Sequence, residues 1–172
     1  MTINRPAPAT PMRGEAADGM RANDLERYLH EQIPLSRALA VHVRHVGPEL
    51  VRLSAPLAPN LNHRRTAFGG SVASLAILAG WSWLLARLAD RDPVPRLVIQ
   101  EQTVQYLAPI DAAFEAACAA PSEAAWRRFV RALDARGRGR LELTAEVTCQ
   151  GRLAAKFHGL YVAIAASPAG ES

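Results

Sequence analysis

Cysteine, lysine and aromatic residues are scarce in this sequence, and their scarcity excludes several kinds of site. Aromatic residues make up 6% of the chain, there are 2 cysteines, and Lys156 is the one lysine among 20 basic residues. Neither cysteine stands at a spacing typical of zinc, iron–sulfur or disulfide frameworks, so no metal site is expected. Cys118 and Cys149 fall within strand-like runs, which predicts that both are buried as small apolar residues.

The N-terminal segment lacks the apolar core of a signal peptide, so we expect a cytoplasmic protein. Residues 1–22 are rich in Pro, Ala and Gly, which predicts a disordered tail. The chain has 172 residues, of which 49% are hydrophobic, enough for one buried core and too little for two. We therefore predict one domain over residues 23–166 and a short C-terminal tail over residues 167–172.

The positive charge of the chain is carried almost entirely by arginine, and the formal net charge is +4. Arginine suits the binding of phosphate groups when several side chains are clustered. However, no aromatic residues interleave these arginines and no groove-reading motif is present, so nucleic acid is not an expected partner.

A long stretch without charge stands in the middle of the chain. Residues 67–86 contain no Asp, Glu, Lys, Arg or His. A segment of this length nearly spans a bilayer, but its serines and glycines suit a hydrocarbon span poorly. A single span would also leave the amphipathic strands of this chain without a core helix to cover. We therefore predict a buried central helix from Gly70 to about Ala89 and no membrane.

Hydrophobic periodicity predicts strands and two further helices around this central helix. An Asn23 or Asp24 cap opens a helix that runs to Ile33, where Pro34 ends it or starts a second short turn. A second amphipathic helix is predicted over residues 121–137, between Pro121 and a terminal glycine. Alternating residues predict strands over 39–46, 49–57, 96–107, 112–120, 140–150 and 152–165. The fold class is α+β, with antiparallel strands around one long helix.

Specific motifs support this arrangement. The run "NHRRTAFGGSVASLA", followed by "VQYLAPI", resembles the signature of hotdog-fold acyl-CoA thioesterases. The segments "IPLSRA", "APLAPNLNHRRTAFGGS", "GW", "RGRGRL" and "GLYVA" are similar to the YiiD C-terminal type of that superfamily. The resemblance covers residues 25–165. It implies an antiparallel sheet wrapped around a central helix, a homodimer or a tetramer, and hydrolysis of an acyl thioester.

Thioester hydrolysis needs fixed hydrogen-bond donors for the oxyanion, a water that is held and deprotonated, and a slot for the substrate. Gly69 and Gly70 stand where the central helix begins, and N–H groups there have no intrahelical partner. The helix dipole adds positive charge at the same point. We therefore expect both glycines to receive the oxyanion, although paired glycines also form ordinary tight turns.

The resemblance leaves the activation of water open. In PaaI-like hotdog enzymes a His precedes the two glycines and an acid follows seven positions after the second, but these positions are Phe68 and Ile77 here. The resemblance also implies that Asn62, six positions before Phe68, orients the water or the thioester carbonyl. The alternative for Asn62 is a cap or turn residue within the loop.

Two titratable residues could replace the missing acid. His63 adjoins Asn62 and titrates in a suitable range. Glu101 lies on the predicted strand over 96–107, where alternation puts Glu101, Thr103 and Gln105 on one face and Gln100, Gln102 and Val104 on the other. Glu101 could equally be a solvated strand residue, or reach the site from a second subunit.

Further residues are candidates for binding the substrate. Thr66, Phe68 and Ser71 adjoin the glycines, and Arg64 and Arg65 stand in the same loop. Arginines of the "RGRGR" run suit the phosphates of coenzyme A or the acidic face of an acyl carrier protein. These three are Arg136, Arg138 and Arg140. A solvated basic loop is the alternative.

The sequence thus predicts a hydrolase of acyl-CoA or acyl-carrier-protein thioesters, with no cofactor other than the substrate's own carrier. Two alternatives stay open. Because the usual acid is replaced by Ile77, the chain could bind an acyl thioester without hydrolysing it. A dehydratase or hydratase of the same fold is less favoured, because those enzymes pair a His with an acid and only His63 is available.

Overall fold

The computed structural model describes residues 20–166. The tails predicted over residues 1–22 and 167–172 lie outside this range, except for Met20, Arg21 and Ala22. Helix α1 (Ala22–Gln32) already begins at Ala22, and a separate short helix α2 (Pro34–Ala38) follows it. Pro34 therefore starts a second turn, one of the two outcomes that the sequence allowed.

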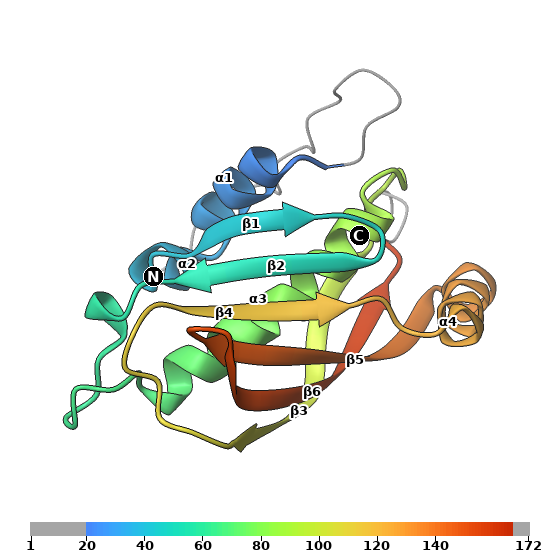
Figure 1. Ribbon diagram of the computed structural model, residues 1–172. Helices are drawn as coiled ribbons and strands as arrows, with labels where there is room; N and C mark the ends of the chain where they lie inside the picture. The colour runs from blue at the N-terminus through green and yellow to red at the C-terminus, as the bar shows by residue number, and fades with distance from the viewer. Residues whose placement is uncertain (1–19, 167–172) are drawn as a thin grey trace, which may run out of the picture.

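Six antiparallel strands form one sheet in the order β1-β2-β4-β5-β6-β3, and α3 crosses one face of it diagonally (Figure 1). This is the α+β arrangement predicted from the sequence. The strands are β1 (His42–Val46), β2 (Leu50–Ala55), β3 (Arg96–Tyr106), β4 (Phe114–Ala119), β5 (Arg138–Cys149) and β6 (Arg152–Ile164).

Helix α3 (Gly69–Leu88) supplies the centre of the core, and its bounds differ by one residue from the prediction. Its length and composition would allow it to cross a membrane, but 67% of its most apolar stretch is buried inside the fold. The Tyr161 hydroxyl of β6 donates to the Ile77 carbonyl at 2.8 Å. A Cβ at Gly80 would lie 2.5 Å from that hydroxyl oxygen, so only glycine lets the helix approach the sheet this closely.

The sheet does not wrap α3 completely. A stripe of its residues stays only partly buried, formed by Ala73, Ser74, Ile77 and Trp81. The Tyr28 ring of α1 stacks on Trp81 with centroids 6.1 Å apart and covers the C-terminal end of the stripe. The N-terminal end of the stripe, with Ala73, Ser74 and Ile77, remains only partly buried.

A fourth helix, α4 (Glu123–Arg136), takes the place of a strand beside β5. β4 pairs only with the second half of β5, from Ala145 to Cys149, and α4 packs along the first half. The Ser122 hydroxyl accepts a hydrogen bond from Ala125 N–H and caps α4, and Gly137 ends it with φ 64°. The connection thus positions the "RGRGR" run at the junction of α4 and β5.

The two glycines of that run are structural. Gly137 takes the left-handed conformation that closes α4. A Cβ on Gly139 would lie 2.8 Å from the Phe129 ring and 2.8 Å from the Phe129 carbonyl oxygen. Both glycines are therefore fixed in place, Gly137 by capping and Gly139 by packing.

Candidate active site

The loop before α3 is a small closed hairpin that is held together by Asn62. An isolated bridge joins Leu61 to Ala67. The Asn62 amide NH₂ donates to Thr66 Oγ1 at 2.9 Å and to the Ala67 carbonyl at 3.3 Å. Its Oδ1 accepts from Arg64 N–H at 2.8 Å and Thr66 N–H at 3.2 Å. The side chain thus ties the loop to itself at four points.

This geometry favours the loop-residue interpretation of Asn62. Both polar atoms of its amide already have protein partners, so neither is free to hold a water as the resemblance implied. The tip of the hairpin carries Arg64 and Arg65, both exposed, and Arg65 has φ 62°. Asn62 therefore fixes the shape of the loop.

A second asparagine anchors the same loop from inside the protein. Asn60 is 1% exposed, and its NH₂ donates to the carbonyls of Leu39 and Pro56 at 3.0 and 2.7 Å. The backbone carbonyl of Asn60 accepts from Phe68 N–H at 2.7 Å. Asn60 thus fixes the residue that precedes α3. Sequence reasoning missed it, because one more asparagine in a loop carries no distinct pattern.

The first turn of α3 presents free N–H donors. Phe68 is the N-cap residue, but no side chain caps the helix and no acidic residue stands in the first turn. Among the described residues, the N–H groups of Gly69, Gly70 and Ser71 have no hydrogen-bond acceptor. The helix start therefore keeps the three donors and the partial positive charge expected there.

Phe68 folds back over this turn. Its side chain is 57% exposed, and its ring occupies the space that a Cβ on Gly70 would need. A larger residue at position 70 would therefore have to displace the Phe68 ring. Ile77 lies two turns further along the same face and is partly buried. Both positions are apolar, as the sequence predicted.

A cavity of about 400 Å³ opens beside this helix start. Apart from Tyr106, its lining is apolar or backbone, and it lies between α3 and the segment that links β3 to β4. The Tyr106 hydroxyl donates to the Gly69 carbonyl at 2.8 Å and joins the two walls. The lining residues are Ala67, Gly69, Val72, Tyr106, Leu107, Ala108, Pro109 and Ile110. We call the start of α3 and this cavity together the α3 mouth.

Sequence reasoning missed several residues of the α3 mouth. Tyr106 and the segment 107–110 appeared only as part of the resembling motif "VQYLAPI", without a role. Ala67 N–H donates to the Ile110 carbonyl at 2.8 Å, and an Arg152 guanidinium N–H donates to the Pro109 carbonyl at 3.2 Å. These bonds hold the linking segment against the loop. The tyrosine within that motif was the available signal.

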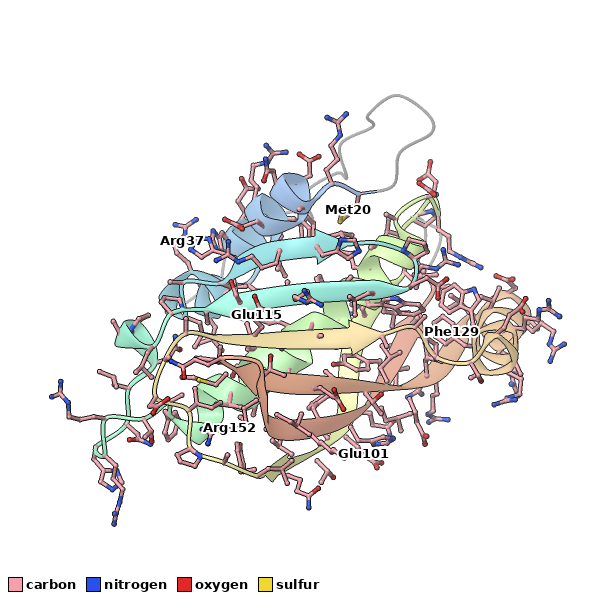
Figure 2. The ribbon with its side chains drawn as sticks, viewed as in Figure 1. Met20, Arg37, Glu101, Glu115, Phe129 and Arg152 are labelled. Carbon is pink, nitrogen blue, oxygen red and sulfur yellow. The ribbon has the colours of Figure 1, made fainter. Side chains whose placement is uncertain are left out.

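The two candidate bases lie in different places. His63 is exposed in the hairpin, next to Asn62. Glu101 is exposed on β3, where its Cα partner is Leu160 and the partner of Leu160 on β5 is Glu142 (Figure 2). Opposed residues of a ladder share a face, and Tyr161, the next residue of β6, points to α3. Glu101 therefore lies on the outer face, away from α3.

A bulge in β3 changes the predicted alternation. The register shifts between Ile99 and Glu101, which leaves Gln100 as the extra residue. Gln100 then contacts outer-face residues, accepting from Arg140 Nε at 3.3 Å and donating to Glu101 at 3.4 Å. Gln102, paired with Gly159, stays on the α3 face. The prediction that Gln100 shares a face with Gln102 is wrong because of this bulge.

The predicted arginines also separate into two groups. Arg64 and Arg65 stand in the hairpin beside the α3 mouth. Arg138 shares the partner Ile164 with Arg96, at the opposite end of β3 from Tyr106. Arg96 and Tyr106 are ten residues apart along β3, which corresponds to about 33 Å of strand. Arg136, Arg138 and Arg140 are thus not brought together with Gly69 and Gly70 in one chain.

Neither cysteine joins this site. Cys118 and Cys149 are buried and unpaired, which confirms the sequence prediction. Burial raises the pKa of the Cys118 thiol to about 12, so it stays protonated and unreactive near neutral pH. Among the residues that the structure describes, no group of three or more His, Cys, Asp or Glu could hold a metal ion.

Comparison with known proteins agrees with the fold and the motifs. Residues 22–165 match the family described as "Putative thioesterase (yiiD_Cterm)". The solved structure of the "putative thioesterase from Shewanella oneidensis" is 31% identical with TM-score 0.71, covering 83% of this chain and 96% of that one. A Chlorobaculum tepidum protein of unknown function is 25% identical with TM-score 0.79, over 84% and 94% of the two chains.

A more distant structure shares the fold alone. The phenylacetic acid degradation protein PaaI from Thermus thermophilus, in a mutant form, is 23% identical with TM-score 0.57, over 76% of this chain and 98% of that one. The family match covers nearly the whole described chain. The chain therefore belongs to the YiiD C-terminal family of hotdog-fold, thioesterase-like proteins.

Proposed function

We propose that the chain hydrolyses an acyl thioester of coenzyme A or of an acyl carrier protein at the α3 mouth. The observation that carries this proposal is the uncapped start of α3, with three free N–H groups beside an apolar cavity. Water adds to the thioester carbonyl, and the oxyanion accepts hydrogen bonds from Gly69 and Gly70. The C–S bond then breaks, the thiol leaves with a proton, and a carboxylic acid remains.

The apolar surroundings of the α3 mouth suit the acyl group. Side chains that are large, apolar and exposed gather there. They are Leu61 (43% exposed), Phe68 (57%), Tyr106 (55%) and Leu107 (46%). Patches of this kind mark ligand or subunit contacts in soluble proteins. A low-polarity mouth also strengthens the hydrogen bonds to a developing oxyanion.

For the activation of water we propose His63. It belongs to the hairpin that flanks α3, whereas Glu101 of the same chain lies on the other face of the sheet. Among the described residues, those that line the cavity include no carboxylate and no imidazole. His63 would therefore act from the rim of the mouth, and the exposed Arg64 and Arg65 beside it would contact the phosphates of the carrier.

We also propose a homodimer. Strand β3 has 11 residues, stands at one edge of the sheet and is exposed over most of its length. A long unpaired edge invites pairing with a second copy, which would also cover the partly open stripe of α3. Light scattering at micromolar concentration checks this proposal, and a monomer there would contradict it.

The proposed reaction is tested by thiol release from a series of acyl-CoA substrates and from acyl N-acetylcysteamine thioesters, which lack phosphate. The informative variant is the Phe68→Ala/Gly70→Pro pair, compared with Phe68→Ala alone. Both remove the ring that would clash with a larger residue 70, but only the pair removes the Gly70 N–H. Loss of one oxyanion donor lowers turnover ~10²–10³-fold. Equal rates in the two variants would remove Gly70 from the mechanism.

A non-catalytic acyl-thioester-binding module is the second candidate. It is favoured by one observation, that apolar Phe68 and Ile77 stand where the family's acid–base pair is expected. Binding of a non-hydrolysable acyl-CoA thioether by calorimetry, without any thiol release from the thioesters, would support this candidate over the hydrolase.

A further inference from the structure

A second concave surface lies away from the α3 mouth, between α4 and the first half of β5. Its volume is about 1160 Å³, above the ~300–1,000 Å³ of common small-molecule sites. Residues of α4 form one wall, and residues of β5 and β6 form the other. Figure 1 shows α4 and the hairpin before α3 at opposite ends of the sheet.

Four arginines line this surface, which we call the arginine groove. Arg128 and Arg136 come from α4, and Arg138 and Arg140 come from β5. Within residues 20–166 none of them pairs with a carboxylate, whereas Arg127 and Arg91 pair with Glu123 and Asp134. The groove thus gathers four guanidinium groups that no carboxylate of the described chain neutralises.

One acidic residue stands among these arginines. Glu142 is the single carboxylate of the described chain that lines the groove, and it lies 3.5 Å from His158 Nε2. Arg140 Nε donates to the neutral Gln100 side chain at 3.3 Å. Four guanidinium groups against one carboxylate leave a strong excess of positive charge, which calls for an anion with more than one charged group.

The floor of the groove is apolar. The partly exposed Leu160, Ala125 and Ala132 form it, above the Phe129 ring, which is 1% exposed and is labelled where α4 meets the sheet in Figure 2. An inorganic anion would leave this floor uncovered. A planar ring attached to the phosphates would cover it, and guanidinium groups also stack on planar rings. The apolar floor and the arginine rim together fit a molecule that carries both a planar ring and phosphate groups.

We propose that the arginine groove binds a nucleotide. Two or more phosphate groups contact Arg128, Arg136, Arg138 and Arg140, and the base lies over the exposed part of the floor around Leu160. The same chemistry has two sources, a free nucleotide and the nucleotide end of coenzyme A. The second source rests on the proposed function. Arg138 lies about 33 Å of strand from Tyr106, so the arginines of the groove do not belong to the α3 mouth of their own chain.

The test is calorimetric titration of the full chain with ATP, ADP, adenosine 3′,5′-bisphosphate, coenzyme A and dephospho-coenzyme A. We expect saturable binding of one nucleotide per chain. The Arg138→Gln/Arg140→Gln pair should weaken it at least 10-fold, because charge-assisted hydrogen bonds are about twice as strong as neutral ones. The matched control is Arg127→Gln/Arg131→Gln, which removes two charges from α4 outside the groove and should leave binding unchanged.

Two results would overturn the proposal: no nucleotide binds the wild-type chain, or the two double variants bind equally well. Circular dichroism confirms that both variants are folded, and Arg128→Gln offers a third variant from the other wall. Tighter binding of coenzyme A than of dephospho-coenzyme A and ATP assigns the groove to the carrier. Comparable binding of ATP and ADP assigns it to a free nucleotide.

The outcome is independent of the proposed hydrolysis. Nucleotide binding is measured without a thioester, and hydrolysis of the N-acetylcysteamine thioester is measured without a phosphate. A chain that hydrolyses this thioester but binds no nucleotide would refute the groove and leave the proposed function standing. A chain that binds nucleotide but releases no thiol would refute the proposed function and leave nucleotide binding in the groove standing.

Discussion

The two ends of the sheet offer opposite chemistry. The α3 mouth provides backbone N–H groups in an apolar setting, and the side chains that line its cavity carry no formal charge. The arginine groove provides guanidinium groups at the rim of a larger surface. Backbone donors suit a charge that develops during a reaction, whereas fixed guanidinium charges suit a ligand that is already an anion.

The difference also lies in what holds each end in place. At the α3 mouth, hydrogen bonds of Asn60, Asn62 and Tyr106 fix the backbone around the helix start. At the groove, aromatic packing holds α4: Trp126 meets Trp83 with centroids 5.5 Å apart and Phe129 at 5.3 Å. Substitutions at the mouth should therefore act on geometry and rate, and substitutions at the groove on charge and affinity.

A large effect on the rate of hydrolysis is expected at Asn62. Asn62→Ala removes the four side-chain hydrogen bonds of the hairpin and leaves only its backbone bonds. A shift of about 1 Å in the reacting groups costs about 10²-fold in rate. We expect hydrolysis of the phosphate-free thioester to fall by about that factor. Thr66→Val, which removes one of the four bonds, should cause a smaller loss. Nucleotide binding by calorimetry should stay unchanged, and an equal loss there would abolish the distinction between the two ends.

A smaller effect is expected at Ile77, on the open stripe of α3. Ile77→Asp places a charge on a partly buried apolar face and should lower the free energy of unfolding by about 2 kcal/mol in urea. Ile77→Asn, which is polar but neutral, is the matched control and should lower it less. A fully stable Ile77→Asp chain with increased hydrolysis would mean that this face is wet and belongs to the reacting site.

Salt should also distinguish the arginine groove from the α3 mouth, with a smaller effect than the substitutions above. Raising the ionic strength from about 0.05 to about 0.2 M shortens the Debye length and screens the exposed guanidinium groups of the groove. We expect severalfold weaker nucleotide binding by titration, with little change in hydrolysis of the phosphate-free thioester. A stronger salt effect on hydrolysis than on nucleotide binding would contradict the assignment of charge to the groove.

Local patterns in the sequence predicted most of the fold. Period-two alternation located all six strands, and the charge-free run located α3 to within one residue at each end. The bulge at Gln100 was not predictable, because alternation assumes a continuous ladder. The incomplete cover of Ile77 was not predictable either, since an apolar helix has the same pattern whether its last face meets the sheet, a second subunit or a ligand.

The part of the candidate site that the paired glycines fix was predictable. The part that depends on contacts between residues distant in the sequence was not. Gly69 and Gly70 lie at the helix start as expected, because paired glycines before an apolar run mark that turn. Tyr106 and Asn60 were missed, since their contacts are to residues 37 and 21 positions away. Arg138 was assigned to the same ligand as Arg64, although the strands carry the two arginines to opposite ends.

The smallest effect is expected at Glu101, which tests whether the outer face contributes to the mouth at all. Its carboxylate lies in the row of Leu160 and Glu142, on the opposite face of the sheet from α3. Glu101→Gln keeps the shape of the side chain, so hydrolysis of the phosphate-free thioester should stay within a factor of about two, since surface changes of this kind are near neutral. His63→Ala should lower the rate more, by the ~10²–10⁴-fold of a general base if His63 activates the water. A collapse in Glu101→Gln with a normal rate in His63→Ala would transfer the base to Glu101, and would require a second chain to bring that carboxylate to the mouth.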